Sequence, residues 1–361
     1  MGTARRAGDG SRRPAMPAWL GRLGVVGAVH RLWARRLTVL AYHRICEPGD
    51  QDGVTLASNI SATPERFAAQ MAHLRRRFDV IALGDLIAWL EGRGRLPRHP
   101  ALITFDDGYR DNLTEALPIL RAAGLPAVLF LATDCVELGQ AFYWDQVAWA
   151  LGHATGLGAV LPLLGACRWH DAAGRAALAE RWVRAAKALP DAERQAMLGR
   201  LLEALAVRLP AAAHAGLHLT WDEVRTLQRG GVEIGAHTRR HAILSRRPAA
   251  EAEAEIAASA ALIAERTGRP VTAFAYPNGG IGDFDESHEA VLRRLGIPAG
   301  FTLVEGPQSL AAVRRRPLRI RRIFIGRRDD LPRFAAKVSG TARLAAALRP
   351  ARGRPAQGRP G

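Results

Sequence analysis

Two adjacent carboxylates end an apolar run in the stretch Ile-Thr-Phe-Asp-Asp-Gly-Tyr, residues 103–109. Residues 101–105 are apolar and β-prone, which predicts a buried strand, and Gly108 is a turn signal just beyond it. Because side chains alternate between the faces of a strand, Asp106 and Asp107 are expected to point in different directions. One carboxylate could then bind a metal ion while the other faces a substrate or a water. A solvated Asp-Asp-Gly turn is the alternative.

Two histidines follow a second short strand, which is predicted for Gly-Val-Glu-Ile at residues 231–234. His237 and His241 are four positions apart, so their side chains meet on one face if the segment turns helically. One Asp and two His suit zinc or a similar divalent ion and leave positions open for water, which indicates a catalytic metal site. Open α/β folds carry their chemistry at such strand ends. A chance or structural pair among eleven histidines is the alternative.

A third junction of the same kind lies at residues 271–280, Val-Thr-Ala-Phe-Ala-Tyr-Pro-Asn-Gly-Gly. An apolar, β-prone run stops at a Pro/Gly turn, which predicts a strand followed by a loop. Taken alone, this junction fits an ordinary connection as well as a functional one. Its position after the other two motifs makes it informative.

The three motifs, in this order, resemble those of the polysaccharide deacetylase family, the NodB-homology domain. The likeness covers about residues 37–137 and 219–326 and includes residues 40–44 (Leu-Ala-Tyr-His-Arg), 63–67 (Thr-Pro-Glu-Arg-Phe) and 117–120 (Leu-Pro-Ile-Leu). The resemblance implies an α/β fold, an irregular (β/α) barrel of about seven strands, and a metal-dependent amidase or esterase that acts on acetylated sugars. The alternation of predicted strands and helices over residues 38–132 also favours a parallel sheet covered by helices.

The resemblance further assigns roles to the motif residues. Asp106 is implied as the general base, and Asp107, His237 and His241 as ligands of a divalent metal ion, for which zinc is expected. Such an ion polarises an acyl carbonyl and lowers the pKa of its water to about 7, and a carboxylate off the metal can accept the water proton. The ion and a backbone N–H of a nearby turn would bind the oxyanion. That turn comprises Tyr276, Pro277 and Asn278.

Ala275 departs from the family pattern, because many relatives carry at this position an arginine that orients the catalytic acid. Without that arginine, another cation has to accompany Asp106, or the base is tuned differently. Arg322 matches a family arginine in a late strand and is the candidate. The alternative is that Arg322 belongs only to the basic C-terminal region.

The late Leu-Xaa-His motif that supplies the general acid in the family is not visible either, since no histidine follows His288. His43 is the candidate replacement, at the end of a strand predicted for residues 38–42. Some family members resemble a circular permutation that moves this strand to the front of the chain. His43 would then protonate the leaving amine, whereas a structural histidine is the alternative.

The predicted organisation has three parts: a basic segment at residues 1–36, the barrel at 37–337, and a basic tail at 338–361. Within the barrel, the Ala-, Leu- and Arg-rich stretch at about 138–219 has amphipathic helical spacing, which predicts a helical insertion. Phe-Tyr-Trp-Asp at residues 142–145 opens this stretch. These aromatic residues are expected to anchor a helix in the core, with Trp144 at the border of a sugar-binding cleft.

The formal charge of +17 is concentrated at the two ends of the chain. Residues 1–40 carry +7 and residues 314–361 carry +13, which leaves −3 for the middle. The Pro/Gly/Arg tail is expected to be disordered. Both ends could bind an anionic membrane surface, and no base-reading pattern predicts a specific nucleic-acid partner. The apolar run after Arg22 is too short for a transmembrane span.

Three cysteines, Cys46, Cys135 and Cys167, lack metal-site spacing and are odd in number. This pattern indicates reduced thiols and favours the cytoplasm, with the inner membrane face as a peripheral location. The predicted function is removal of an N-acetyl group from a sugar of a polysaccharide, an oligosaccharide or a lipid-linked glycan. Removal of a formyl group or an O-acetyl ester is the alternative among enzymes, and a non-catalytic glycan- or membrane-binding protein is the alternative outside them.

Overall fold

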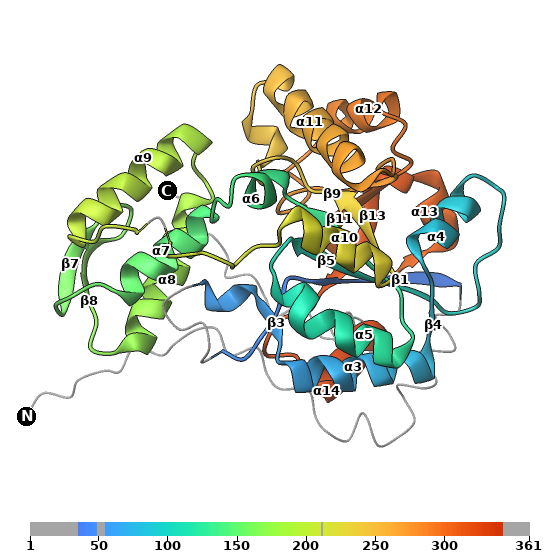
Figure 1. Ribbon diagram of the computed structural model, residues 1–361, viewed down its shortest axis with the longest axis horizontal. Helices are drawn as coiled ribbons and strands as arrows, with labels where there is room; N and C mark the ends of the chain where they lie inside the picture. The colour runs from blue at the N-terminus through green and yellow to red at the C-terminus, as the bar shows by residue number, and fades with distance from the viewer. Residues whose placement is uncertain (1–34, 49–54, 211, 342–361) are drawn as a thin grey trace, which may run out of the picture.

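Seven parallel strands close into a barrel in the computed structural model, which describes residues 35–48, 55–210 and 212–341 (Figure 1). Their order is β1-β13-β11-β10-β9-β6-β5, and β5 pairs back onto β1. The predicted irregular (β/α) barrel is confirmed. The strands are β1 (Arg36–Tyr42), β5 (Pro100–Asp107), β6 (Ala127–Leu131), β9 (Val232–Ala236), β10 (Ala273–Ala275), β11 (Ala299–Glu305) and β13 (Ile320–Phe324).

The barrel closes where its first strand lies between its last strand and β5. β1 is rich in β-branched and large apolar residues, and all of it is buried apart from its half-buried first residue. Leu40 pairs with Ile103 of β5 on one side and with Ile323 of β13 on the other. Because all seven strands run in the same direction, their C-terminal ends form one rim, where parallel α/β folds place their sites. Membership of a circularly permuted subgroup stays a prediction.

Helices and short strands surround this barrel. β4 (Asp79–Val80) pairs with β5, β12 (Gln308–Ser309) pairs antiparallel with β1, and β2 (Arg44–Ile45) pairs with β3 (Ile60–Ala62). The covering helices are α3 (Pro64–Arg77), α4 (Leu83–Leu90), α5 (Leu117–Ala123), α10 (Trp221–Arg229), α11 (Ala249–Thr267), α12 (Glu286–Arg294), α13 (Leu310–Arg315) and α14 (Leu331–Val338). Short helical turns are η2 (Ala57–Asn59), η3 (Asn112–Ala116), η4 (Leu244–Arg246) and η5 (Pro317–Arg319).

Helix α3 illustrates how local sequence sets an element. The Thr63 side chain accepts a hydrogen bond from the Arg66 N–H, and proline at the first helical position adds a preset φ. Phe67, Met71 and Leu74 follow at helical spacing and are fully buried in the main core. Local sequence therefore sets both the start of this helix and the face that it buries.

The chain between β6 and α10 forms a lobe beside the barrel, drawn in green and yellow-green in Figure 1. Its own apolar cluster includes Trp169, Trp182 and Leu201, all buried. The predicted helices are present, but the lobe also contains an antiparallel hairpin that the sequence analysis did not predict. Its strands are mostly exposed, so they lack the apolar alternation that reveals a strand. The elements are α6 (Thr133–Glu137), α7 (Tyr143–Gly152), β7 (Gly158–Leu161), β8 (Gly165–Arg168), α8 (Ala172–Ala186) and α9 (Asp191–Ala204).

The basic ends of the chain lie mostly beyond the described residues, since 1–34 and 342–361 are outside them. The proposed domain limits, the disorder of the tail and its membrane contact therefore stay predictions. Among the helices that the structure does describe, none has the length and apolar character needed to cross a bilayer. All three cysteines are free and buried.

Candidate metal and catalytic site

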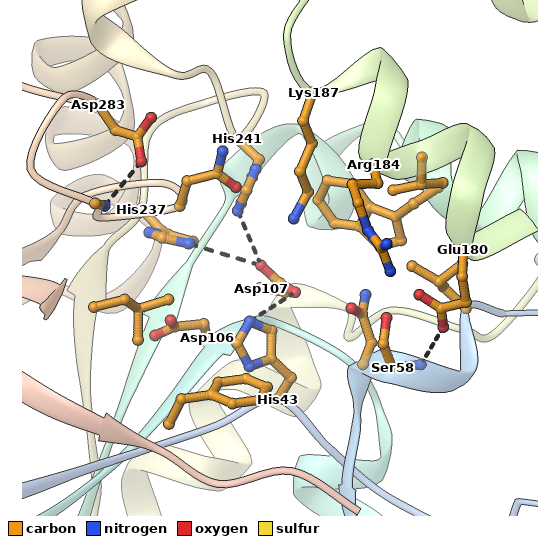
Figure 2. Close-up of a pocket in the computed structure, with 18 residues that line it drawn as sticks. His43, Ser58, Asp106, Asp107, Glu180, Arg184, Lys187, His237, His241 and Asp283 are labelled. Carbon is orange, nitrogen blue, oxygen red and sulfur yellow. Dashed lines mark hydrogen bonds and ion pairs between the residues drawn. The ribbon is translucent and has the colours of Figure 1, made fainter. Parts of the chain in front are cut away.

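The C-terminal rim of the barrel opens into a cavity of about 490 Å³ (Figure 2). Strand β1 brings His43 to it, β5 brings Asp106 and Asp107, and the loop after β9 brings His237 and His241. These five predicted residues, which are separated by up to about two hundred positions in the chain, line one space. The strand-end placement inferred from sequence explains why they meet.

Asp107 lies at the centre of this group. Its Oδ1 is 3.7 Å from His237 Nε2 and 3.6 Å from His241 Nε2. The Asp107 carboxylate is buried, and neither of its oxygens accepts a hydrogen bond from a described residue. Buried carboxylate oxygens without partners are costly, so this arrangement needs a further positive group. One ligand atom from each of these three residues lies within 4.8 Å of the others, a spacing that fits a single metal ion.

The two histidines present the nitrogen that a metal requires. His237 Nδ1 lies 2.7 Å from the carbonyl oxygen of Ala275, which can only accept, so Nδ1 carries the hydrogen and Nε2 keeps its lone pair. Burial lowers the pKa of His237, and it lowers the pKa of His241 well below the usual value. Both rings are therefore neutral near pH 7, the form that binds metals.

The segment that carries His237 and His241 is not helical, so the helical turn that the sequence analysis considered is not what brings the two side chains together. Residues 237–243 form an irregular loop in which Thr238 has φ 62° and His241 has φ 56°. The Glu255 carboxylate of α11 accepts hydrogen bonds from the backbone N–H groups of Arg239 and Arg240 and holds this loop. The rings still meet, with centroids 4.7 Å apart. Left-handed backbone at non-glycine residues is strained and concentrates at functional sites.

Asp107 has the same backbone feature, with φ 79°, as it leaves strand β5. Gly108 follows with φ 102°, and a Cβ at that position would lie 2.5 Å from Leu131 Cδ1. The glycine of the Asp-Asp-Gly motif therefore serves a tight turn against β6. This turn directs the Asp107 side chain to the histidines.

Asp106 points instead to a buried arginine. Arg322 of β13 donates from both terminal nitrogens to the two Asp106 oxygens, at 2.6 and 2.8 Å. The arginine is fully buried, and its Nε donates to the carbonyl of Thr302. It is absent from the cavity lining, so it positions Asp106 from behind. The cation that relatives supply from the position of Ala275 on β10 thus comes here from β13, two strands away in the sheet.

The pKa values of the two adjacent carboxylates are consequently shifted in opposite directions. Burial raises the pKa of Asp107 well above its usual value, and the negative charges of Asp106 and Asp145 add to this. Burial also acts to raise the pKa of Asp106, but the charge and hydrogen bonds of Arg322 outweigh it, so the pKa of that carboxyl is lowered. Asp106 is therefore ionised without a metal, whereas Asp107 needs a cation beside it.

His43, at the end of β1, faces the Asp107 carboxylate. Its Nε2 is 4.0 Å from Asp107 Oδ2, and its ring packs edge-on against Phe324 at 5.6 Å. Burial lowers its pKa to about 4, while the negative charge of Asp106 acts in the opposite direction. His43 Nδ1 is buried and has no hydrogen-bond partner among the described residues. The strand therefore brings a neutral imidazole to the cavity.

The turn after β10 meets the expectation for only one of its three residues. The Tyr276 N–H donates to the Phe301 carbonyl in the sheet, its hydroxyl donates to the Leu318 carbonyl, and its ring stacks on Phe284. Neither polar group of Tyr276 thus faces the cavity, and Pro277 has no N–H. Asn278 lines the cavity with φ 59°, and its N–H is the remaining candidate oxyanion donor of this turn.

Trp144 lies both in the core of the lobe and at the border of the cavity, the two positions that its sequence context suggested. It is buried in the apolar cluster of the lobe, stacked on Phe142 at 4.3 Å, and it also lines the cavity, edge-on to His241 at 4.8 Å. Its Nε1 donates to the Tyr109 hydroxyl, which donates to Asp145 Oδ2 at 2.7 Å. This buried hydrogen-bond chain joins α7 to the Asp-Asp-Gly-Tyr motif, and the sequence analysis did not foresee it.

The opposite wall of the cavity was also not predicted. Glu180 and Arg184 of α8 and Lys187 at its C-terminal end line it. The Lys187 side chain points toward Asp107, whereas the Glu180 carboxylate accepts a hydrogen bond from the Ser58 N–H (Figure 2). Their spacing of four and three residues puts them on one helix face, opposite the buried Trp182. This spacing was a signal in the sequence, but only the packing of the lobe shows that the face borders the site.

Residues 93–153 and 178–300, over half of the chain, match the polysaccharide deacetylase family. The chain therefore belongs to the polysaccharide deacetylase family. It is a hydrolase of the class that acts on carbon–nitrogen bonds other than peptide bonds. No curated protein sequence matches it.

Solved deacetylase structures share the fold at low sequence identity. The deacetylase PplD of Streptococcus pyogenes, solved in complex with acetate, is 16% identical, with a TM-score of 0.56 over 84% of this chain and 98% of that chain. A polysaccharide deacetylase from Bacillus cereus is 17% identical, with a TM-score of 0.53 over 85% and 70%. IcaB of Ammonifex degensii is 18% identical, with a TM-score of 0.52 over 84% and 97%.

Proposed function

We propose that this protein is a divalent-metal-dependent deacetylase that removes the N-acetyl group from a sugar of a polysaccharide, an oligosaccharide or a lipid-linked glycan. One observation carries the proposal: the unpartnered Asp107 carboxylate faces two neutral histidines and lies beside an ionised Asp106. Metal-assisted hydrolysis of an acyl bond requires metal ligands and, beside them, a carboxylate that can accept a proton.

Asp107, His237 and His241 are the proposed metal ligands, and their mixed oxygen and nitrogen donors suit zinc. When bound there, a divalent ion supplies Lewis-acid chemistry, polarising an acyl carbonyl and lowering the pKa of a water. Three protein ligands leave room for substrate, as in catalytic rather than structural sites.

The other residues of the cavity are proposed to handle protons and charge. Asp106, held in one orientation by Arg322, accepts the proton of the attacking water. The Asn278 N–H binds the oxyanion. His43 gives a proton to the leaving amine. Because its pKa of about 4 makes the ring neutral near pH 7, His43 has to acquire that proton during the reaction. The proposed source is Asp106, after it has accepted the proton of the attacking water.

The site also bears on the alternatives. Loss of catalysis was left open by Ala275, but the Arg322–Asp106 pair supplies the cation that this position lacks, which argues against a purely binding role. A formyl group or an O-acetyl ester presents the same carbonyl to the same groups, so substrate assays have to separate these acyl groups.

The deciding experiment measures acetate and formate release from a matched panel. Zinc-loaded protein would be given N-acetylated, N-formylated and O-acetylated forms of the same oligosaccharide, with Asp106→Asn as the inactive control. We expect acetate from the N-acetylated form, and free amine in the product mass. Release from the ester or the formamide alone would replace the proposal with the corresponding alternative.

Cytoplasmic residence, with the inner membrane face as a peripheral site, is likewise a proposal. The three free, buried cysteines support a reducing compartment. The basic ends are the proposed contact with anionic lipid.

A further inference from the structure

A larger groove of about 1090 Å³ adjoins the catalytic cavity. The two spaces share the lining residues Leu56, Ser58, Glu180, Arg184 and Phe324. One side of the groove is helix α8, and the other is the segment at residues 324–329 that follows β13. A chain-like substrate could therefore extend from the metal site along α8.

Positive charge dominates this path. Five arginine side chains on it form no ion pair or hydrogen bond with any residue that the structure describes: Arg175, Arg181, Arg184, Arg327 and Arg328. The lysine of the groove, Lys337, is neutralised by Asp329. The remaining acid, Glu180, accepts a hydrogen bond from the Ser58 N–H.

A further cation on the lobe side of the catalytic cavity is Lys187. It lies one helical turn beyond Arg184, and both side chains point into the cavity from α8 (Figure 2). Neither forms an ion pair with a described residue. Two cations thus stand opposite Asp107, on the side from which a sugar next to the acetylated one would enter.

Unpaired cations on both walls of one groove repel each other, so the arrangement costs folding free energy unless a ligand compensates it. A neutral glycan offers hydroxyl groups and apolar ring faces, which can accept hydrogen bonds but bring no negative charge to compensate these cations. Guanidinium groups match the oxyanions of carboxylate and phosphate in a bidentate geometry, and a lysine provides a point charge for the same groups.

We propose that the substrate of this enzyme is an anionic glycan. Arg184 and Lys187 bind an oxyanion next to the acetylated sugar, and the groove arginines bind oxyanions farther along the chain. The inference rests on the proposed deacetylase function. Two sources supply the same chemistry: the carboxylates of acidic sugars within a polysaccharide, and the phosphates that link a sugar to a lipid carrier.

The test compares three compounds that carry the same acetylated sugar. They are a neutral N-acetylglucosamine oligomer, an oligosaccharide that alternates N-acetylglucosamine with glucuronate, and N-acetylglucosamine diphosphate with a short lipid chain. We expect kcat/KM to be about tenfold or more higher for at least one anionic compound than for the neutral one at low salt, the worth of a charged hydrogen bond. This advantage should shrink as salt increases. The preferred compound identifies the source.

Variants assign the effect to the cavity wall. Arg184→Gln combined with Lys187→Gln should lower kcat/KM about tenfold more for the preferred anionic compound than for the neutral one. The single variant Arg184→Lys keeps a positive charge, so it should retain more of the preference for the anionic compound than the double variant does. Arg200→Gln is the matched control, because Arg200 is an exposed arginine of α9 in the same lobe and lines neither the cavity nor the groove. It should change neither value.

Calorimetric binding of the three compounds to the full chain separates this inference from the proposed function. Tighter binding of the anionic compounds, reduced in the double variant, supports the inference whether or not acetate is released. Equal binding and equal kcat/KM for all three compounds would overturn it. Absence of acetate from every compound would count against the deacetylase function instead.

Discussion

The cavity has a barrel side and a lobe side, and the two differ in how their charged groups are held. On the barrel side, Asp106 and Arg322 are at most 1% exposed and fixed by two hydrogen bonds to each other. On the lobe side, Arg184 and Lys187 are exposed side chains on one helix face, without ion-pair partners among the described residues. The barrel groups are preorganised, whereas the lobe groups are free to adapt to a ligand.

This difference separates two tasks within one site. Bond cleavage needs groups with fixed geometry and shifted pKa values, and the buried strand ends supply them. Selection among glycans needs charged side chains that can reach a ligand, and the exposed side chains of α8 provide them. The account therefore predicts large effects for changes on the barrel side and graded effects for changes away from it.

The largest effect is expected for His43 on the barrel side. If it donates a proton to the amine, His43→Ala should lower the rate on an N-acetylated sugar by about 10²–10⁴-fold and keep the metal. The loss on a nitrophenyl acetate ester should be much smaller, because nitrophenolate leaves without a proton. The rate ratio of the two substrates in the same folded variant decides the point, and equal losses would return His43 to a structural role.

Because the Arg322–Asp106 pair is buried, breaking it should lower the unfolding free energy of the protein. Arg322→Gln leaves the Asp106 carboxylate buried without its partner, and we expect a loss of about 3–5 kcal/mol in unfolding free energy. The exposed neighbour Arg321 on the same strand gives the control, Arg321→Gln, with little change. Denaturant unfolding measures both.

The pH dependence of this loss follows from the sign of the shift. The pKa of Asp106 is lowered in the folded protein, so its contribution is complete above the unfolded value of about 3.9 and is lost as pH falls through the folded pKa. The gap between parent and Arg322→Gln should thus narrow only in acid. A gap that stayed constant to low pH would remove the ionic account of the pair.

A smaller effect is expected at Asp145, where the lobe meets the barrel. Burial raises its pKa to about 7, so the folded state binds a proton that the unfolded state has lost above about pH 3.9. Stability from this group is full below that value and declines as pH rises toward 7. Asp145→Asn has no such decline, so its melting temperature relative to the parent should rise from pH 5 to pH 8.

Glu203→Gln, at an exposed position of α9, is the control for this comparison and should show no such trend. If the two variants behaved alike, burial would not raise the pKa of Asp145 in the folded protein.

The smallest effect on chemistry is expected outside both sides of the cavity. Deleting residues 342–361 should leave kcat/KM on a soluble N-acetylated oligosaccharide unchanged, because the tail supplies none of the cavity groups named here. Binding to vesicles that contain anionic lipid should weaken and lose salt dependence. Sedimentation with such vesicles that does not respond to the deletion would remove the membrane-surface proposal.

The sequence predicts which residues line the barrel side of the cavity, because most of them belong to short motifs at strand ends. The Asp106–Asp107 pair, His237 and His241 were singled out from residue type and spacing. The choice of Asp107 as the ligand came from the resemblance, as did His43 and Arg322. What local patterns do not encode is backbone shape. The histidine loop is irregular rather than helical, and Tyr276 turns its hydroxyl to Leu318 rather than to the cavity. Both depend on tertiary contacts.

The lobe side is poorly predicted for a different reason. Arginine and lysine on an amphipathic helix normally face solvent, so Arg184 and Lys187 look like any other polar face in the sequence. Only the docking of α8 beside the barrel rim makes that face a cavity wall. The exposed β7–β8 hairpin escaped prediction in a similar way, because its strands bury little.

Metal content tests the central claim most directly, because it asks whether the two adjacent carboxylates have different tasks. Elemental analysis of the zinc-loaded parent should give about one equivalent. His237→Ala, His241→Ala and Asp107→Asn should each lose most of it, whereas Asp106→Asn should keep the metal and lose turnover. Equal metal content in all five proteins, or equal loss in both Asp variants, would contradict the assigned ligand set and the base beside it.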